Sequence, residues 1–411
     1  MKPTLAAQLL LPLALGALAP AANAQISDGA VRIGVINDES GPYAALSGPG
    51  SVVAVQMAAE DMKAKLGGVK VEVLVADHQN KPDIGITIVK RWFDVDKVDA
   101  VMDVANSAVA LGVQAVIKEK NKIAMYGPIG TTELTGKQCA RTGFSWMHDS
   151  YVLVSGPVKT LTRAGFDTWY FVAADFAFGK NMVVEAKKLL GSSGGRELGE
   201  TFHPMNTTDY SSFLLQAQGS GAKVVAFANG GAQLVNSMKQ WKEFGMGDGG
   251  RQRPVATLLS LSDVHAAGLD VMQGLSATTE WYWDLNDQSR AFARRFLERF
   301  KSMPTESQAA MYSAATHYLE AVAATKTDAT DAVARQMRST PVNDMYARNA
   351  PLREDGKLIH DFLLVTVKSK AESKAAWDYY RVDRVIPAAD AFAPVSQSEC
   401  PLIAAAAAKT P

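Results

Sequence analysis

Residues 31–75 contain, in order, the apolar run VRIGVI (31–36), a break at Gly41-Pro42-Tyr43, a helical pattern over 51–65 and the alternating run VKVEVLV (69–75). The helical pattern places apolar side chains at positions 52, 55, 59 and 62, on one helix face. Two strands joined through such a helix are the unit of a parallel sheet, because parallel neighbours need a crossover connection. This stretch therefore predicts an α/β fold.

The same alternation continues in two blocks. The first block adds helices over 84–93 and 109–117 and strands over 99–104 and 123–126. After His148 the rhythm restarts, with helices over 151–163, 181–190, 210–218 and 233–244 and strands over 168–172, 196–202, 224–228 and 254–258. We expect two lobes, each a parallel sheet flanked by helices, because one hydrophobic core rarely holds so long a chain.

The late segments are expected to return to both lobes. Helical patterns lie over 288–301 and 307–324, and strand patterns over 360–367 and 377–382. We assign residues 25–148 and 282–343 to the first lobe, 149–281 and 344–392 to the second, and 393–411 to a C-terminal tail. Such crossings predict a hinge of several strands.

The first 24 residues have the pattern of a secretory signal peptide. Lys2 precedes an apolar run over 5–18, and Ala22-Asn23-Ala24 forms a small-residue cleavage site. The run is shorter than the roughly 20 residues of a stable membrane span. We expect cleavage after Ala24 and a mature chain that works outside the cytoplasm, in the periplasm. An uncleaved anchor is the alternative.

Composition narrows the classes of function. The chain has 42 basic and 42 acidic side chains, and loss of Lys2 leaves a net charge of about −1 (41 minus 42). This balance gives no reason to expect a nucleic-acid partner. The sequence has no P-loop, and its six histidines are scattered. We therefore expect no catalysis, no cofactor and no metal site.

The chain has two cysteines, Cys139 and Cys400. In an exported protein, a pair of cysteines favours one disulfide. This bond would tie the C-terminal tail to the first half of the chain. Two unpaired thiols are the alternative.

Ligands of open parallel sheets bind outside the carboxyl ends of the strands. In the first lobe this rule selects loops 38–43, 105–108 and 127–132, and in the second lobe loops 174–179, 229–232 and 260–263. Ser107 and Thr131 each lie at an expected helix start, where hydroxyls and free N–H groups attract a carboxylate. Plain helix capping is the alternative function of these hydroxyls.

Four segments in these loops carry a family resemblance: SGPY (40–43), GTTELT (130–135), DFAFG (175–179) and DYSSF (209–213). Together they resemble the periplasmic solute-binding proteins of branched-chain amino acid ABC importers. The resemblance implies a type I architecture of two lobes that close on a small solute, with ABC permease subunits as partners. The alternative is a ligand-sensing protein that serves a membrane signalling partner without transport.

The resemblance also implies which residues hold the solute. Its carboxylate would be held from the first lobe, and an aromatic ring at Phe178 would cover it from the second. Tyr151, Asn229 and Gly230 would face the cleft opposite the first lobe. The full set of expected ligand-binding residues is Ser40, Tyr43, Asn106, Ser107, Ala108, Gly130, Thr131, Tyr151, Phe178, Asn229, Gly230 and Ser260.

The chain departs from the amino-acid binders of this family at one loop. Those proteins place an acidic residue near Ser260 to pair with the ligand's ammonium, whereas residues 258–262 here read LLSLS. Asp263 follows in what we expect to be the first turn of a helix, and Asp175 is an alternative partner. Because an unpaired buried ammonium is costly, a benzoate-like acid becomes a candidate beside an amino acid.

Overall fold

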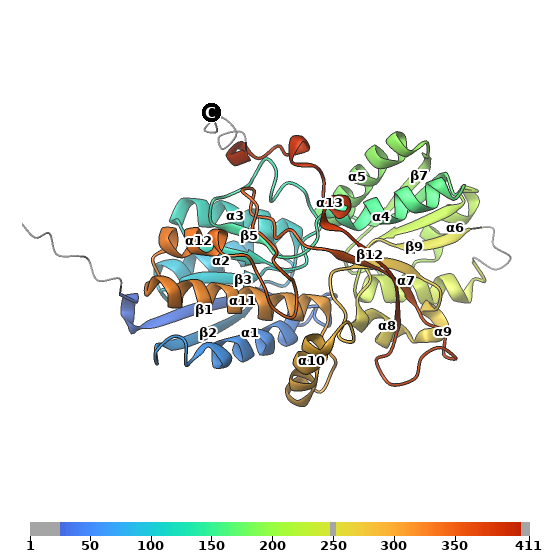
Figure 1. Cartoon of the computed structure of the whole chain (residues 1–411). Helices are drawn as coiled ribbons and strands as arrows, with labels where there is room; N and C mark the ends of the chain where they lie inside the picture. The colour runs from blue at the N-terminus through green and yellow to red at the C-terminus, as the bar shows by residue number, and fades with distance from the viewer. Residues whose placement is uncertain (1–24, 247–251, 404–411) are drawn as a thin grey trace, which may run out of the picture.

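The computed structural model describes residues 25–246 and 252–403. The expected signal peptide, residues 1–24, and the end of the tail lie outside the described residues. The described chain forms two lobes side by side, with the N-terminal third of the sequence in one and the middle of the sequence in the other (Figure 1). No helix among the described residues has the length and apolar character needed to cross a membrane.

The first lobe is built on a five-stranded parallel sheet in the order β2-β1-β3-β4-β5. Its strands are β1 (Ala30–Asn37), β2 (Lys70–Asp77), β3 (Ala100–Asp103), β4 (Ile123–Tyr126) and β5 (Gly143–Ser145). Its helices are η1 (Ser27–Gly29), α1 (Gly48–Met62), α2 (Pro82–Asp94), α3 (Ser107–Lys120), α10 (Asp287–Phe300), α11 (Glu306–Thr325) and α12 (Thr330–Ser339). The late helix α11 packs along α1, as the late helical patterns led us to expect.

The second lobe is built on a four-stranded parallel sheet in the order β7-β6-β8-β9. Its strands are β6 (Thr168–Ala174), β7 (Arg196–His203), β8 (Val224–Ala228) and β9 (Arg253–Ala256). Its helices are α4 (Ser150–Arg163), α5 (Ala177–Ser193), α6 (Ser211–Gly219), α7 (Ala232–Glu243), α8 (Leu261–Ala267) and α9 (Leu269–Met272). Every residue of β6 and β8 is buried, as expected for strands covered by helices on both faces.

A third sheet joins the second lobe at α4. It is antiparallel, in the order β10-β11-β12, with β10 (Ser276–Thr279), β11 (Phe362–Val367) and β12 (Tyr380–Ile386). Sequence patterns predicted β11 and most of the other long elements, but missed the short strands β5 and β10 and the helix α12. The chain also returns to the second lobe later than the expected boundary at residue 344, because Leu358 N still donates to Ser145 O at the edge of the first sheet.

Three chain crossings form the hinge, and buried polar contacts join them. His148 on the first crossing contacts Glu280 on the second through its Nδ1 atom, and its backbone N–H donates to the same carboxylate at 3.0 Å. His360 on the third crossing is buried, and this burial lowers its pKa. The three crossings therefore share one desolvated polar cluster, which fixes their order side by side.

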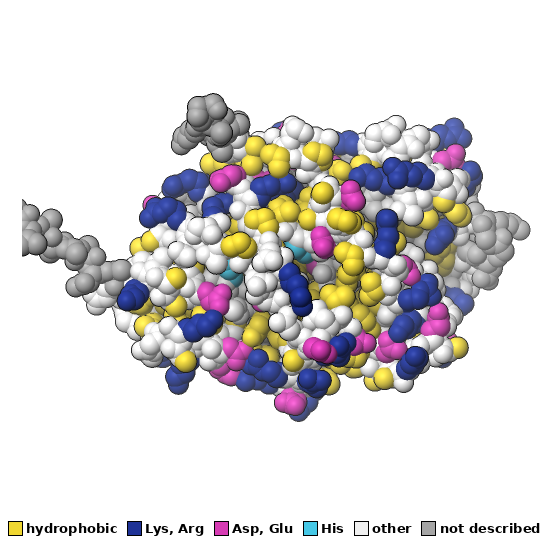
Figure 2. Space-filling view, in the orientation of Figure 1, with side chains coloured by type: hydrophobic (Ala, Val, Ile, Leu, Met, Phe, Trp, Pro, Cys, Tyr) yellow, Lys and Arg dark blue, Asp and Glu magenta, His cyan; other side chains and the backbone are white. Residues whose placement is uncertain are grey.

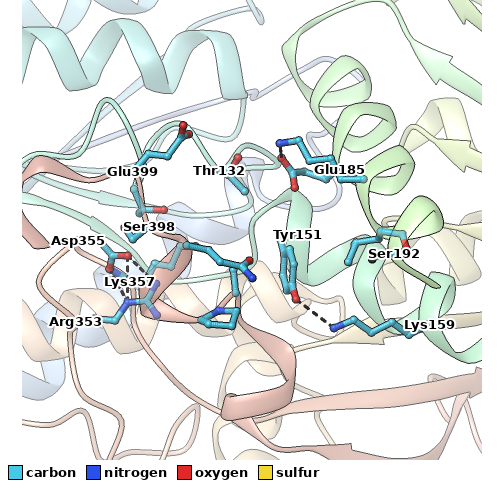
Figure 3. Close-up of a pocket in the computed structure, with 17 residues that line it drawn as sticks. Thr132, Tyr151, Lys159, Glu185, Ser192, Arg353, Asp355, Lys357, Ser398 and Glu399 are labelled. Carbon is cyan, nitrogen blue, oxygen red and sulfur yellow. Dashed lines mark hydrogen bonds and ion pairs between the residues drawn. The ribbon is translucent and has the colours of Figure 1, made fainter. Parts of the chain in front are cut away.

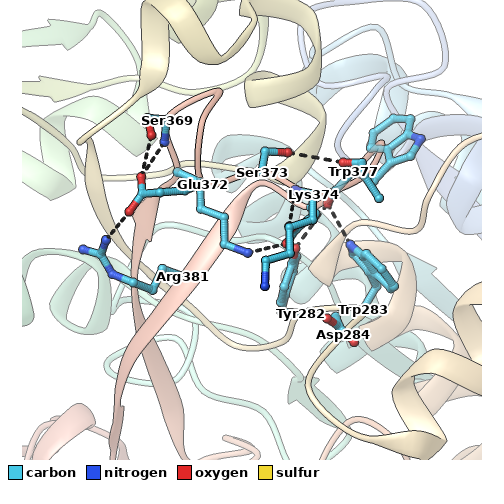
Figure 4. A network of polar contacts seen from close by, with 12 residues as sticks. Tyr282, Trp283, Asp284, Ser369, Glu372, Ser373, Lys374, Trp377 and Arg381 are labelled. Carbon is cyan, nitrogen blue, oxygen red and sulfur yellow. Dashed lines mark hydrogen bonds and ion pairs between the residues drawn. The ribbon is translucent and has the colours of Figure 1, made fainter.

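The connection between β11 and β12 docks on the second crossing (Figure 4). The carbonyl oxygen of Trp377 accepts hydrogen bonds from Tyr282 Oη at 3.2 Å and Trp283 Nε1 at 2.9 Å. Within the connection, Lys368 pairs with Asp378. These contacts tie the far end of the third sheet to the start of the first-lobe return.

The C-terminal tail makes a fourth connection between the lobes, which we call the strap (residues 387–400). It begins on the second lobe with α13 (Ala388–Ala391), where Phe392 packs against Val152 and Phe362. It passes through η3 (Val395–Gln397) and ends at a disulfide between Cys400 and Cys139, which lies in the first lobe. The predicted bond between the two cysteines is present, and it links the lobes covalently.

Charged side chains are dispersed over the surface. On the face shown in Figure 2, basic and acidic side chains are interspersed among neutral ones. Such a surface offers no extended basic patch of the kind that binds nucleic acid on that face.

Loss of the strap's disulfide should loosen the lobes. We expect the Cys139→Ser/Cys400→Ser variant to lose roughly 2–4 kcal/mol of unfolding free energy, the usual contribution of a disulfide. Its ligand-free form should also show a larger radius of gyration by small-angle X-ray scattering, because the strap limits lobe opening. Lys137→Ala, which removes only the exposed pair with Glu399, is the control. Equal stability and equal radius in the double variant and the native protein would contradict this role.

Candidate functional site

The carboxyl ends of the two parallel sheets face each other, and their loops touch. Ala232 N, at the start of α7 in the second lobe, donates to Pro42 O in the loop after β1 at 3.1 Å. Tyr43 Oη lies 3.4 Å from Gln233 Oε1, and the Tyr43 ring meets Phe176 edge-on at 6.4 Å between centroids. Tyr43 is only 5% exposed, so the lobes are closed around it.

The first lobe contributes two adjoining loops of small polar residues. Asn106 caps α3 by accepting hydrogen bonds from Ala108 N at 3.0 Å and Val109 N at 3.1 Å. Because Asn106 is the cap, the hydroxyl of Ser107 has another partner, and it accepts from Gly130 N at 3.2 Å. The two loops that the sequence singled out separately are therefore hydrogen-bonded to each other.

Two hydroxyl groups of these loops accept a hydrogen bond but do not donate one to another described residue. Ser107 Oγ and Thr131 Oγ1 each accept a backbone N–H, from Gly130 and Glu133 respectively. Among the described residues neither hydroxyl has an acceptor for its own proton. Both residues are about 2% exposed, so two buried O–H donors are available to an anionic group.

The second lobe closes over these loops with aromatic side chains. A Cβ added to Gly130 would lie 2.4 Å from Phe178 Cδ2 and 2.6 Å from Met182 Cε, so only a glycine permits this approach of α5. Phe178 stacks on Phe176, with ring centroids 6.2 Å apart. The aromatic cover that the sequence predicted at Phe178 thus lies directly on the first-lobe loop.

Asn229 and Gly230 follow β8 on the same side. Asn229 Nδ2 lies 3.1 Å from His203 Nε2, whereas Asn229 Oδ1 is buried and has no partner among the described residues. A Cβ at Gly230 would lie 2.7 Å from Leu258, so this loop packs tightly on the next one. Asn229 therefore presents an unused acceptor inside the closed molecule.

Two expected site residues lie elsewhere. Ser40 is exposed and its hydroxyl donates to Asp77 within the first lobe at 3.0 Å, so it lies apart from the buried loops, and its ligand-binding assignment stays a prediction. Tyr151 Oη accepts from Lys159 and lines a different cavity of about 570 Å³, beneath the strap (Figure 3). That cavity is also lined by Thr132 and Ser398, and none of the loop residues described above borders it.

The expected partners for an ammonium group have other functions. Asp175 is exposed and pairs with Lys180 at 2.8 Å. Asp263 is buried and forms a capping box with Ser260 at the start of α8. Burial raises the pKa of Asp263 to about 7, although backbone N–H groups of Ser260 and Gly231 oppose the shift.

Glu306 is a buried acid at the contact between the lobes that sequence reasoning missed. It is the first residue of α11, and its Oε2 accepts from Ser260 Oγ at 3.2 Å across the two lobes. Its Oε1 is buried and has no partner among the described residues. Burial, with smaller contributions from Glu280 and Asp263, raises the pKa of Glu306 to about 8. An acid in a first helical turn is ordinary in sequence, so nothing in the pattern revealed its burial.

The chain matches a known family and several solved structures. Residues 30–372 match the family described as periplasmic binding protein. A periplasmic binding protein from Burkholderia mallei is 39% identical, with a TM-score of 0.88 and coverage of 91% of this chain and 99% of that one. A branched-chain amino acid ABC transporter periplasmic ligand-binding protein from Burkholderia xenovorans is 38% identical, with a TM-score of 0.81 and coverage of 91% and 100%.

A more distant structure shares the fold alone. A solute-binding protein of R. palustris in complex with benzoate is 18% identical, with a TM-score of 0.81 and coverage of 91% of this chain and 100% of that one. A search of curated proteins found no match.

The buried acid should make stability depend on pH. Burial raises the pKa of Glu306 from its ordinary value of 4.5 to about 8, so between these values the folded chain keeps a proton that the unfolded chain has lost. Unfolding free energy should therefore fall as pH rises from about 5 to about 8. Urea unfolding of the ligand-free protein across this range should show a smaller fall for Glu306→Gln than for the native protein. A surface control, Glu320→Gln, should follow the native curve, and an unchanged slope in Glu306→Gln would contradict the assignment.

Proposed function

This chain belongs to the periplasmic binding protein family, and we propose that it is the extracytoplasmic receptor of an ABC importer. It would capture a small carboxylate-bearing solute, an amino acid or an aromatic or organic acid, between its lobes. The closed complex would then deliver the solute to the membrane permease. We propose binding and release without catalysis.

One observation carries the proposal. Two buried hydroxyls, of Ser107 and Thr131, are held by backbone N–H groups and keep their own protons free for a carboxylate. The start of α3 adds the positive end of a helix dipole, although Asn106 already accepts from the N–H groups of Ala108 and Val109. Hydrogen bonds from neutral donors can hold a carboxylate without a basic side chain, because each charge-assisted bond is strong when water is excluded.

The solved structures support the same range of solutes. The Burkholderia xenovorans relative is named as a branched-chain amino acid transporter component, and the R. palustris protein was solved with benzoate. Both kinds of solute carry a carboxylate, and they differ in whether an amine accompanies it. We therefore infer that the solute of this chain carries a carboxylate.

Binding can be tested on the ligand-stripped mature chain. We expect at least one member of a panel of leucine, valine, phenylalanine, glutamate, benzoate and hydroxybenzoates to raise the melting temperature. A ligand at 100 times its dissociation constant adds about 2.7 kcal/mol. Urea and short neutral amides are the controls, since they lack the carboxylate. Stabilisation by the amides alone would refute a carboxylate receptor.

Phe178→Ala should weaken binding of that ligand by about 2 kcal/mol or more, the size expected for a buried aromatic anchor. The loss in binding should exceed the loss in unfolding free energy of the empty protein, because the lobes cover Phe178 only when they close. Phe166→Ala, a half-buried ring of the same lobe outside the cleft, is the matched control. Calorimetric titration and urea unfolding measure the two quantities, and equal affinity in Phe178→Ala would place the ring outside the site.

A further inference from the structure

Glu306 lies where the two lobes meet. Its helix, α11, is anchored to the first lobe's loop by Thr305 Oγ1, which donates to Leu46 O at 2.6 Å. From there Glu306 Oε2 reaches Ser260 Oγ at the start of α8 in the second lobe. Glu306 is 3% exposed and Ser260 is fully buried, so this contact is inside the closed molecule.

A chain of contacts links Glu306 to the aromatic cover of the site. Phe178 stacks on Phe176, and Phe176 meets Tyr43 edge-on. Leu46, three residues beyond Tyr43 on the same loop, accepts the hydrogen bond from Thr305 that anchors Glu306. Glu306 is therefore connected, through the loop after β1, to the aromatic side chains that cover the first-lobe loops.

The described surroundings of Glu306 are acidic or neutral. The titratable groups that act on it or are acted on by it are Asp263, Glu280, Tyr346 and Tyr380. Its Oε1 has no partner among the described residues, and neither has Oδ1 of the fully buried Asn229. Burying a carboxylate without a cation carries a large desolvation free energy. A protonated amine on the ligand is a group that would offset this penalty by pairing with the carboxylate.

We propose that Glu306 binds a protonated amine of the ligand, so that the natural solute is an amino acid and not a benzoate-like acid. The inference rests on the proposed function and narrows its solute class. It also replaces the expectation drawn from the loop 258–262: the acid missing there is supplied from α11, on the other side of the closed cleft. The shift in the pKa of Glu306 agrees with this, because its proton is the substitute for a cation when the site holds none.

The test compares solutes that differ only in the amine. Calorimetric titration of the ligand-stripped native chain would use leucine against 4-methylpentanoate and phenylalanine against 3-phenylpropanoate, with benzoate alongside. We expect the amine-bearing member of at least one pair to bind about 30-fold or more tightly than its partner, the effect of an unpaired buried charge. This comparison needs no variant, so it holds whether or not substitutions at Glu306 fold.

Variants then assign the effect to Glu306. Glu306→Gln keeps the shape of the side chain and its contact with Ser260. We expect it to lower the affinity for the amine-bearing solute about 30-fold or more. It should change the affinity for the amine-free partner far less. Ser260→Ala leaves the carboxylate in place, so it should lower the affinity for the amine-bearing solute less than Glu306→Gln does. Glu320→Gln on the surface should leave this affinity unchanged.

Two results would overturn the inference while leaving the proposed function intact. These are equal or tighter binding of the amine-free solutes by the native chain, and an unchanged affinity for the amino acid in Glu306→Gln. Binding of neither class of acid would instead overturn the proposed function, and the inference with it. The outcomes are therefore distinguishable within one set of titrations.

Discussion

Parallel pairing is the constraint on which this molecule depends. Because all strands of each main sheet run the same way, their carboxyl ends, and the loops that follow them, gather at one edge. The contact between His148 and Glu280 joins two of the three crossings that set these edges face to face. Residues far apart in sequence, such as Ser107, Gly130 and Phe178, then meet without any long excursion of the chain.

The contacts across the cleft are weak and noncovalent, whereas the disulfide on the strap is covalent. Across the cleft, the hydrogen bond from Ala232 to Pro42 and the edge-on contact of Tyr43 with Phe176 are each small, so a ligand can shift the balance between open and closed forms. The disulfide between Cys139 and Cys400 is covalent and sits beyond the cleft on the strap. We therefore expect it to limit how far the lobes separate.

The sequence predicted the long strands and helices better than the short elements and the contacts between the lobes. Strands such as β1 and β6 carry continuous apolar runs because both of their faces are covered, and these were found. The three residues of β5 are too few to show a pattern. Ser40 fits the motif of its loop, yet its hydroxyl donates to Asp77. This contact depends on the position of the neighbouring strand β2, which the loop motif does not reveal. Glu306 was missed because burial of a first-turn acid is decided by the opposite lobe.

The position of Glu306 has a consequence for how binding drives closure. In the open form this carboxyl would be separated from Ser260 and hydrated, and ionisation would be favoured by its place at the start of α11. Closing an empty cleft must neutralise or desolvate it, which opposes closure. A ligand whose cation meets Glu306 removes this penalty, while its carboxylate meets the hydroxyls of Ser107 and Thr131. The same buried acid that selects the ligand would then also couple its arrival to the closed shape, because the ligand's cation would remove the penalty of burying Glu306 against the second lobe.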